Sequence, residues 1–109
     1  MPKKLKGKHI YELSRPYIRS LFIHDLRSAI CKHNKRFSEV FHKSEELVLQ
    51  QTITPEILEE LLEYCNKRID QARYIFDRGL SIGYNEIDVI GCYSDLYQKI
   101  TELINEKNV

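Results

Sequence analysis

The strongest constraint on the fold of this chain is a helical repeat of apolar residues between Thr54 and Gly79. The repeat alternates steps of four and three residues, which places its members on one side of an α-helix. Its members are Leu58, Leu62, Cys65, Ile69, Ala72 and Phe76. Thr54 can cap the helix, Pro55 suits its first position, and Gly79 suits the left-handed residue just beyond its end. We therefore predict a helix over residues 55–78.

A second helix is expected after a short turn. Asn85 is a good N-cap, and Asp88 stands three residues later, where an acidic side chain can complete a capping box. An apolar seam follows, formed by Ile90, Tyr93, Tyr97, Ile100 and Ile104. Because the connection is short, the two helices should pack antiparallel as a hairpin. Gly91 interrupts the second helix, and we expect it to permit close packing against a neighbouring helix.

The first half of the chain leaves two alternatives open. Ser14 and Pro16 can open a helix, and the expected inner face comprises Ile18, Phe22, Leu26, Ile30 and His33. The same register continues through Phe37, Val40 and Leu47, so one helix could cover about residues 16–50. We favour a break between His33 and Ser44, because helices of about 35 residues are rare. An unbroken helix would leave apolar surface for a second copy of the chain to cover.

The predicted fold class is therefore all-α. We expect a small antiparallel helical bundle, with either four helices or one long first helix plus a C-terminal helical hairpin. A chain of 109 residues fits one domain. We expect a flexible basic N-terminal tail over residues 1–9 and a single helical domain over residues 10–109.

The location expected from the sequence is cytoplasmic. No apolar run approaches the roughly 18 residues needed to cross a bilayer, and the lysines near the N-terminus are not followed by the apolar segment of a secretion signal. The three cysteines, Cys31, Cys65 and Cys92, lie far apart. An odd number without paired spacing argues against a disulfide framework.

The net charge of +1 conceals a division of the chain into two oppositely charged parts. Residues 1–43 hold eleven Lys or Arg and three Asp or Glu, a balance of +8. Residues 44–109 hold six basic and thirteen acidic side chains, a balance of −7. This asymmetry suggests that the chain recognises a charged partner.

The basic part supplies the preferred candidate binding residues. On helical spacing they form neighbouring groups on the first helix, and such a surface attracts polyanions because each neutralised phosphate releases counterions. These candidates are Arg15, Arg19, Arg27, Lys32, Lys35 and Arg36. The expected partner is a nucleic acid or an acidic protein.

The acidic part offers an alternative binding surface. Glu56, Glu59, Glu60 and Glu63 cluster on the first turns of the predicted helix 55–78, and Glu45 and Glu46 precede them. Such a face could dock on a basic protein, as the inhibitors and immunity proteins of nucleases do. The chain would then act as an inhibitor of a basic enzyme.

The usual catalytic and metal-binding signatures are missing from the sequence. Its four glycines form neither a P-loop nor a dinucleotide fingerprint, and no serine lies in a nucleophile elbow. Glu39 and His42 form a single Glu-x-x-His pair, whereas a di-iron bundle needs two such pairs and two further glutamates. We therefore expect no metal, no cofactor, no catalytic residue and no small-molecule substrate.

One spacing nevertheless suggests a second alternative. Arg27 and His33 are separated by five residues, as are Arg36 and His42. This spacing is similar to the motif of the HEPN ribonucleases, which are small helical bundles that bring two such motifs together in a dimer. The resemblance implies that the arginine holds phosphate while the histidine acts as general acid and base.

Taken together, these patterns favour a non-enzymatic helical binding protein that acts as a regulator. The basic N-terminal half is its expected working surface. A homodimer is the expected assembly, and no membrane partner is expected.

Overall fold

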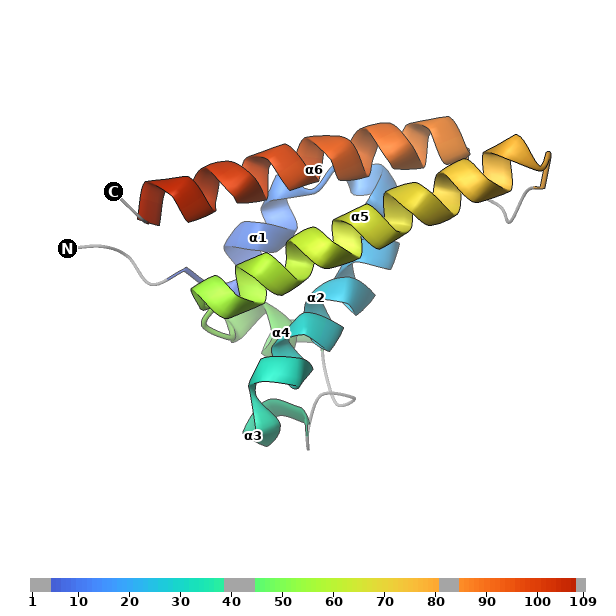
Figure 1. The fold of residues 1–109 in the computed structure, drawn as a ribbon. Coiled ribbons are helices and arrows are strands. Elements are labelled where there is room, and N and C mark those ends of the chain that lie inside the picture. The colour runs from blue at the N-terminus through green and yellow to red at the C-terminus, as the bar shows by residue number, and fades with distance from the viewer. Residues whose placement is uncertain (1–4, 39–44, 81–84, 108–109) are drawn as a thin grey trace.

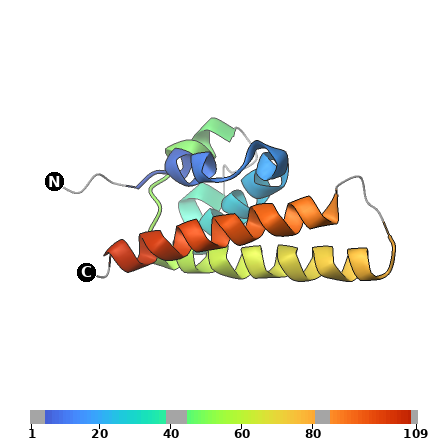
Figure 2. The ribbon, with the colours of Figure 1, turned by 90° about the horizontal axis from the view of Figure 1, so that it is seen from above.

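The computed structural model describes residues 5–38, 45–80 and 85–107 of the 109-residue chain. The fold is all-α, as the sequence predicts. Its elements are α1 (Gly7–Leu13), the short 3₁₀ helix η1 (Pro16–Ile18), α2 (Arg19–His33), α3 (Lys35–Ser38), α4 (Glu45–Gln50), α5 (Pro55–Asp77) and α6 (Glu86–Lys107). The long helices α5 and α6 lie side by side as an antiparallel hairpin, with α1, α2 and α4 packed together along one side of it (Figures 1 and 2).

Local capping groups set the bounds of the hairpin where the sequence predicts them. The Thr54 hydroxyl accepts a hydrogen bond from the Ile57 amide at 3.4 Å, and α5 begins at Pro55. Gly79 follows the helix with a φ of 68°, the left-handed conformation that glycine adopts without strain. At the start of α6, the Asn85 Oδ1 accepts hydrogen bonds from the amides of Ile87 and Asp88, at 3.0 and 3.3 Å.

The first half of the chain is broken into short helices, so the alternative of one long helix is wrong. α2 ends at His33, and Asn34 has extended backbone angles, with φ −143° and ψ 97°. α4 begins at Glu45, which confirms the favoured break between His33 and Ser44. The broken chain folds back, which lets both α2 and α4 pack within one compact unit.

The N-terminal segment differs from the predicted flexible tail over residues 1–9. Residues 1–4 lie outside the described residues, but α1 already begins at Gly7. The Gly7 amide donates to the Gln51 carbonyl, and the Ile53 amide donates to the Leu5 carbonyl, each at 2.8 Å. Gly7 is buried, and a Cβ atom there would collide with the carbonyl oxygen of Val48. This close backbone approach pairs the segment before α1 with the segment between α4 and α5, a contact that sequence periodicity does not reveal.

The hydrophobic core lies between α2 and the hairpin. The inner face predicted for α2 is confirmed for Ile18, Phe22, Leu26 and Ile30, each at most 1% exposed. Leu58 and Leu61 of α5 and Tyr93, Leu96 and Ile100 of α6 belong to the same core, to which α1 and α4 add Ile10 and Val48. These residues are fully buried without any second chain.

Two predicted details of the hairpin are wrong. Ile75 is buried near the end of α5, while Phe76, which the seam places inside, is 52% exposed. Gly91 is exposed, and a Cβ atom there would meet nothing within 4 Å, so it allows no close helix packing. At the loop end of the hairpin, Tyr74, Leu80 and Ile87 are also more than half exposed.

None of the helices within residues 5–38, 45–80 and 85–107 combines the length and the apolar character needed to cross a membrane.

Candidate functional site

The fold itself uses three of the six predicted binding residues, and two of these, Arg15 and Arg19, lie near the start of α2. The Arg15 Nε lies 3.6 Å from a carboxylate oxygen of Asp95 on α6. Arg19 donates through its Nε to the Ser14 carbonyl at 3.1 Å, and its guanidinium stacks over the Tyr11 ring at 5.4 Å. Both side chains therefore connect α2 and its preceding turn to neighbouring elements.

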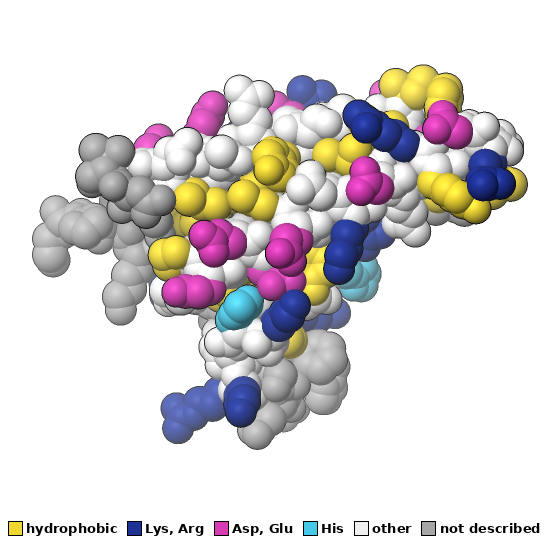
Figure 3. All heavy atoms as spheres, in the orientation of Figure 1, with side chains coloured by type: hydrophobic (Ala, Val, Ile, Leu, Met, Phe, Trp, Pro, Cys, Tyr) yellow, Lys and Arg dark blue, Asp and Glu magenta, His cyan; other side chains and the backbone are white. Residues whose placement is uncertain are grey.

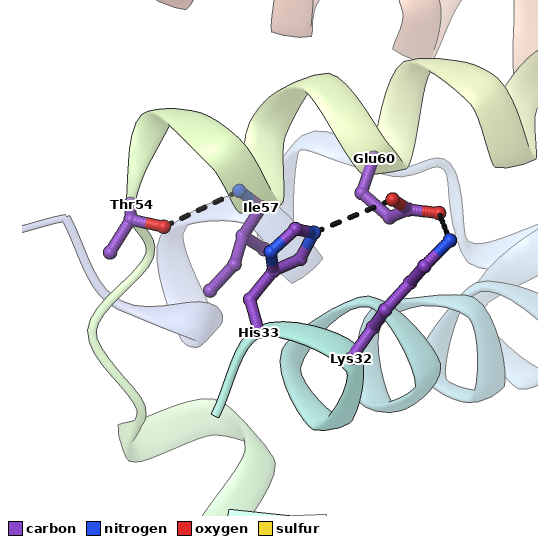
Figure 4. A network of polar contacts seen from close by, with 5 residues as sticks. All are labelled: Lys32, His33, Thr54, Ile57 and Glu60. Atoms are coloured by element: carbon purple, nitrogen blue, oxygen red, sulfur yellow. Dashed lines mark hydrogen bonds and ion pairs between the residues drawn. The ribbon is translucent and has the colours of Figure 1, made fainter. Parts of the chain in front are cut away.

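Lys32 and His33, at the end of α2, converge on Glu60 of α5 (Figure 4). The Lys32 Nζ donates to Glu60 Oε2 at 3.2 Å, and His33 Nε2 lies 3.4 Å from Oε1. Burial by itself would raise the pKa of Glu60, but the hydrogen bonds from these two side chains hold it below its ordinary value. The same hydrogen bond raises the pKa of Lys32. This contact joins the positive and negative parts of the chain within one molecule.

Asp25, the one carboxylate within α2 and α3, points into the core. It accepts two hydrogen bonds from Arg68 of α5, at 2.9 and 3.1 Å, and one from the Tyr93 hydroxyl of α6 at 3.0 Å. Burial raises the pKa of Tyr93, and the negative charge of Asp25 raises it further. The guanidinium of Arg68 compensates the charge of Asp25. Because Asp25 is buried, no acidic side chain of α2 or α3 reaches the surface.

The four remaining candidates, Arg27, Lys32, Lys35 and Arg36, lie on the outer side of α2 and on α3; we call them the cationic face. Arg27 and Lys32 line a shallow hollow together with Ser28 and Cys31. The Nε of Arg27 is inaccessible to solvent and has no hydrogen-bond partner among the described residues. Burial raises the pKa of the Cys31 thiol, and the nearby Arg27 charge partly opposes this shift.

A group of acidic side chains lies beside this region, over the N-terminal half of α5 (Figure 3). Glu56, Glu59 and Glu63 are exposed there, while Glu60 is buried against α2. A hydrogen bond with its own backbone, together with one from Thr54, lowers the pKa of Glu56. The acidic surface proposed as the alternative is therefore present, although one of its members serves the fold.

Of the two Arg–His pairs that resemble the HEPN motif, only Arg27 and His33 both lie within the described residues. His33 lies against Glu60, whereas Arg27 belongs to the hollow with Cys31. His42 and Glu39 lie outside the described residues. Within the described ranges, no group of three or more His, Cys, Asp or Glu side chains is arranged to hold a metal ion.

Two features of the sequence indicate buried polar contacts that helical periodicity alone does not reveal. Asp25 follows Phe22 by three residues and precedes Leu26 directly, which places it on the apolar side of the helix, where an acid must find a buried partner. Glu60 follows Leu58 by two residues and Ile57 by three, which places it beside the apolar seam of α5. Neither signal identifies Arg68, Tyr93 or Lys32 as the partner.

Comparison of this chain with protein-family models, with curated proteins and with solved structures finds no match.

Proposed function

We propose that this chain is a non-enzymatic binding protein that contacts nucleic acid through its cationic face. The observation that carries the proposal is the inward direction of Asp25, which leaves α2 and α3 with basic side chains outside and no carboxylate of their own there. Phosphate groups are the natural partners of such a surface, because arginine can hold them with two parallel hydrogen bonds.

The ion pair of Lys32 with Glu60 limits the number of free charges on this surface. About three basic side chains are then expected to neutralise phosphates. For duplex DNA, this number predicts an affinity loss of about 40-fold between ~50 and ~200 mM salt. The predicted salt dependence is thus modest, as befits a small interface.

The test measures fluorescence anisotropy of labelled single-stranded RNA and duplex DNA at those two salt concentrations. Replacing Arg27 and Arg36 together with glutamate should abolish binding at low salt. The matched control replaces Lys67 and Arg73, two exposed cations of α5, with glutamate and should retain most of the affinity. Equal loss in both variants, or no binding by the wild type at low salt, would contradict the proposal.

The same RNA, recovered after incubation, tests the non-enzymatic part of the proposal. We expect it to remain intact. Cleavage by the wild type that disappears in His33→Ala would replace our proposal with the HEPN-like alternative.

A further inference from the structure

The hairpin of α5 and α6 has one side that no other described helix covers. Glu60 of α5 forms its ion pair with Lys32 of α2, and Lys99 of α6 donates to the Leu13 carbonyl of α1 at 3.3 Å. The helices α1, α2 and α4 all lie on that same side of the hairpin (Figure 2). The other side is therefore open within the part of the chain that the structure describes.

An apolar line runs along the open side of each helix. Neighbouring residues of an α-helix point about 100° apart, so residues two positions apart point in nearly opposite directions. Leu62 follows Glu60 by two positions, and the side chain of Leu62 therefore points away from α2. Tyr97 precedes Lys99 by two positions and points away from α1 in the same way.

Each of these two residues belongs to a set with seven-residue spacing, which keeps its members on one side of the helix. We call the six side chains the open seam: Leu62, Ile69 and Phe76 on α5, and Ile90, Tyr97 and Ile104 on α6.

The open seam is accessible to solvent although it is apolar. Five of its side chains are only partly buried against the core, and Phe76 is 52% exposed. Figure 3 views this side of the hairpin, where apolar side chains run along α5 and α6. From Leu62 to Phe76 the seam extends about 21 Å, or about four helical turns. One further helix of that length would cover it.

Acidic side chains border the α5 part of the open seam. Glu63, Asp70 and Asp77 each come directly after a seam residue, at the same seven-residue spacing, and all three are exposed. Glu59, about one turn before Glu63, is exposed on the same flank. Arg73 is the one basic side chain of α5 on this flank, so four carboxylates stand against one guanidinium, a balance of −3.

The α6 border of the open seam is uncharged. The residues directly after its three seam members are Gly91, Gln98 and Asn105. Lys67 of α5 stands two positions before Ile69, so its ammonium group points to the opposite side, where it lies over the Tyr64 ring at 5.5 Å. The negative charge of the α5 border is therefore not offset by Lys67.

We propose that the open seam binds an amphipathic helix of another protein, with apolar side chains at heptad spacing and lysine or arginine on one flank. The apolar side chains pack along the seam, which removes apolar surface from water, and the basic flank lies against the acidic border of α5.

A second copy of this chain does not meet this description. It would bring a second acidic border, and the apolar side of its basic helix α2 is buried in its own core. The open seam shares no residue with the cationic face, so the proposal is independent of nucleic-acid binding.

The probe is a synthetic helical peptide of about 18 residues, long enough to span the seam, with leucine at the a and d heptad positions, lysine on the flanks and alanine elsewhere. It is titrated into the full chain at neutral pH and followed by amide chemical shifts in NMR. We expect saturable binding, with shifts centred on Leu62, Ile69 and Tyr97. A peptide with glutamate in place of lysine should not bind, and neither should a scrambled lysine peptide without an apolar side.

Four results would overturn the proposal. Equal binding of the lysine peptide and its scrambled form would show charge attraction alone, and equal binding of the lysine and glutamate peptides would show apolar adhesion alone. Titration without saturation would show that the seam binds no such helix. A dimer of the chain alone in light scattering, with dilution shifts centred on the seam, would assign the seam to a second copy.

Charge reversal on α5 tests the acidic border directly. Asp70→Lys together with Asp77→Lys changes two exposed side chains and should weaken binding of the lysine peptide by about tenfold or more, because repulsion replaces attraction. The matched control, Glu102→Lys together with Glu106→Lys, makes the same change of charge on α6. Both control residues are two positions from Ile104 and point away from the seam, so the affinity should change by less than about threefold. Equal weakening in the two double variants would remove the role of the acidic border.

Discussion

Asp25 is the residue on which three helices converge. Its carboxylate lies on α2 and accepts hydrogen bonds from Arg68 of α5 and Tyr93 of α6. A buried charge is tolerated only where partners satisfy it, and removing one partner leaves the other charge uncompensated. The side chain therefore fixes how α2 sits against the hairpin.

We predict that Asp25→Asn lowers the free energy of unfolding by about 3 kcal/mol, the lower end of the range for a broken buried pair. The lower end applies because Arg68 is 28% exposed and water can solvate part of its charge. Urea denaturation followed by circular dichroism measures the change.

The control for this prediction is Asp95→Asn, which removes the partner of Arg15 and Lys99 at the surface. Exposed ion pairs contribute little, so its cost should stay below about 1 kcal/mol. Equal destabilisation by the two variants would show that Asp25 has no special structural role.

Glu60 gives the stability a dependence on acid pH. Folding lowers its pKa below the ordinary value of 4.5. Its ion pair with Lys32 therefore stabilises the fold above about pH 4.5, and this stabilisation is lost as the pH falls through the lower pKa of the folded state. Glu60→Gln should accordingly be less stable than the wild type at pH 7, and the difference should shrink below pH 4.5. Denaturation series at pH 7 and pH 3 measure it; a constant difference would contradict the assignment.

Contacts between residues far apart in the sequence explain why the sequence reveals little of the candidate site. Asp25 and Tyr93 are 68 residues apart, and Lys32 and Glu60 are 28 apart. Periodicity indicates which side of a helix is apolar, but not which side chain of another helix lies opposite. The charge division along the chain predicted a basic surface, whereas the pairing of Lys32 and Arg15 with acids came only from the tertiary fold.

At the scale of the elements, capping and turn residues were sufficient to predict where the two hairpin helices begin and end. Thr54, Pro55, Gly79 and Asn85 each act within a few residues, and the hairpin bounds follow them closely. The short helices α1 and α4 have seven and six residues, too few for a reliable apolar period. They depend on packing for their stability, as helices of this length do.

The two glycines at Gly7 and Gly91 should respond in opposite ways to replacement by alanine. Gly91→Ala should stabilise the protein by about 1 kcal/mol, because the position is exposed, open and within α6. Gly7→Ala should destabilise it by about 1–3 kcal/mol, since the added methyl group collides with the Val48 carbonyl.

Thermal denaturation measures both variants. A change of 1 kcal/mol corresponds to a shift in Tm of about 4–8 °C for a domain near this size. A loss of stability in Gly91→Ala would mean that a partner or a neighbouring segment uses the open space above α6.

At the scale of the whole molecule, the two oppositely charged parts of the chain share one core. The first half supplies α2, and the second half supplies the hairpin that covers it. One reason to expect a homodimer is an unbroken first helix, which would leave apolar surface for a second copy to cover. Because α2 ends at His33 and packs on α5 of its own chain, that reason no longer applies. Light scattering measures the mass in solution.

We predict that the fragments 1–53 and 54–109 complement each other. Fragment 1–53 should be largely unfolded alone, because α5 and α6 complete its core. Mixing the fragments should raise the helical circular dichroism signal above the sum of the separate signals, with 1:1 stoichiometry. A fragment 1–53 that folds alone would show that the two halves are separate units.

The backbone pairing of Leu5 and Gly7 with Gln51 and Ile53 has a consequence for synthesis on the ribosome. The first helix emerges early, but the residues it pairs with are translated more than forty positions later. Until residue 53 leaves the exit tunnel, the segment around Leu5 and Gly7 lacks these backbone partners. At about 5–20 residues per second, that interval lasts several seconds, during which a chaperone or a protease can reach it.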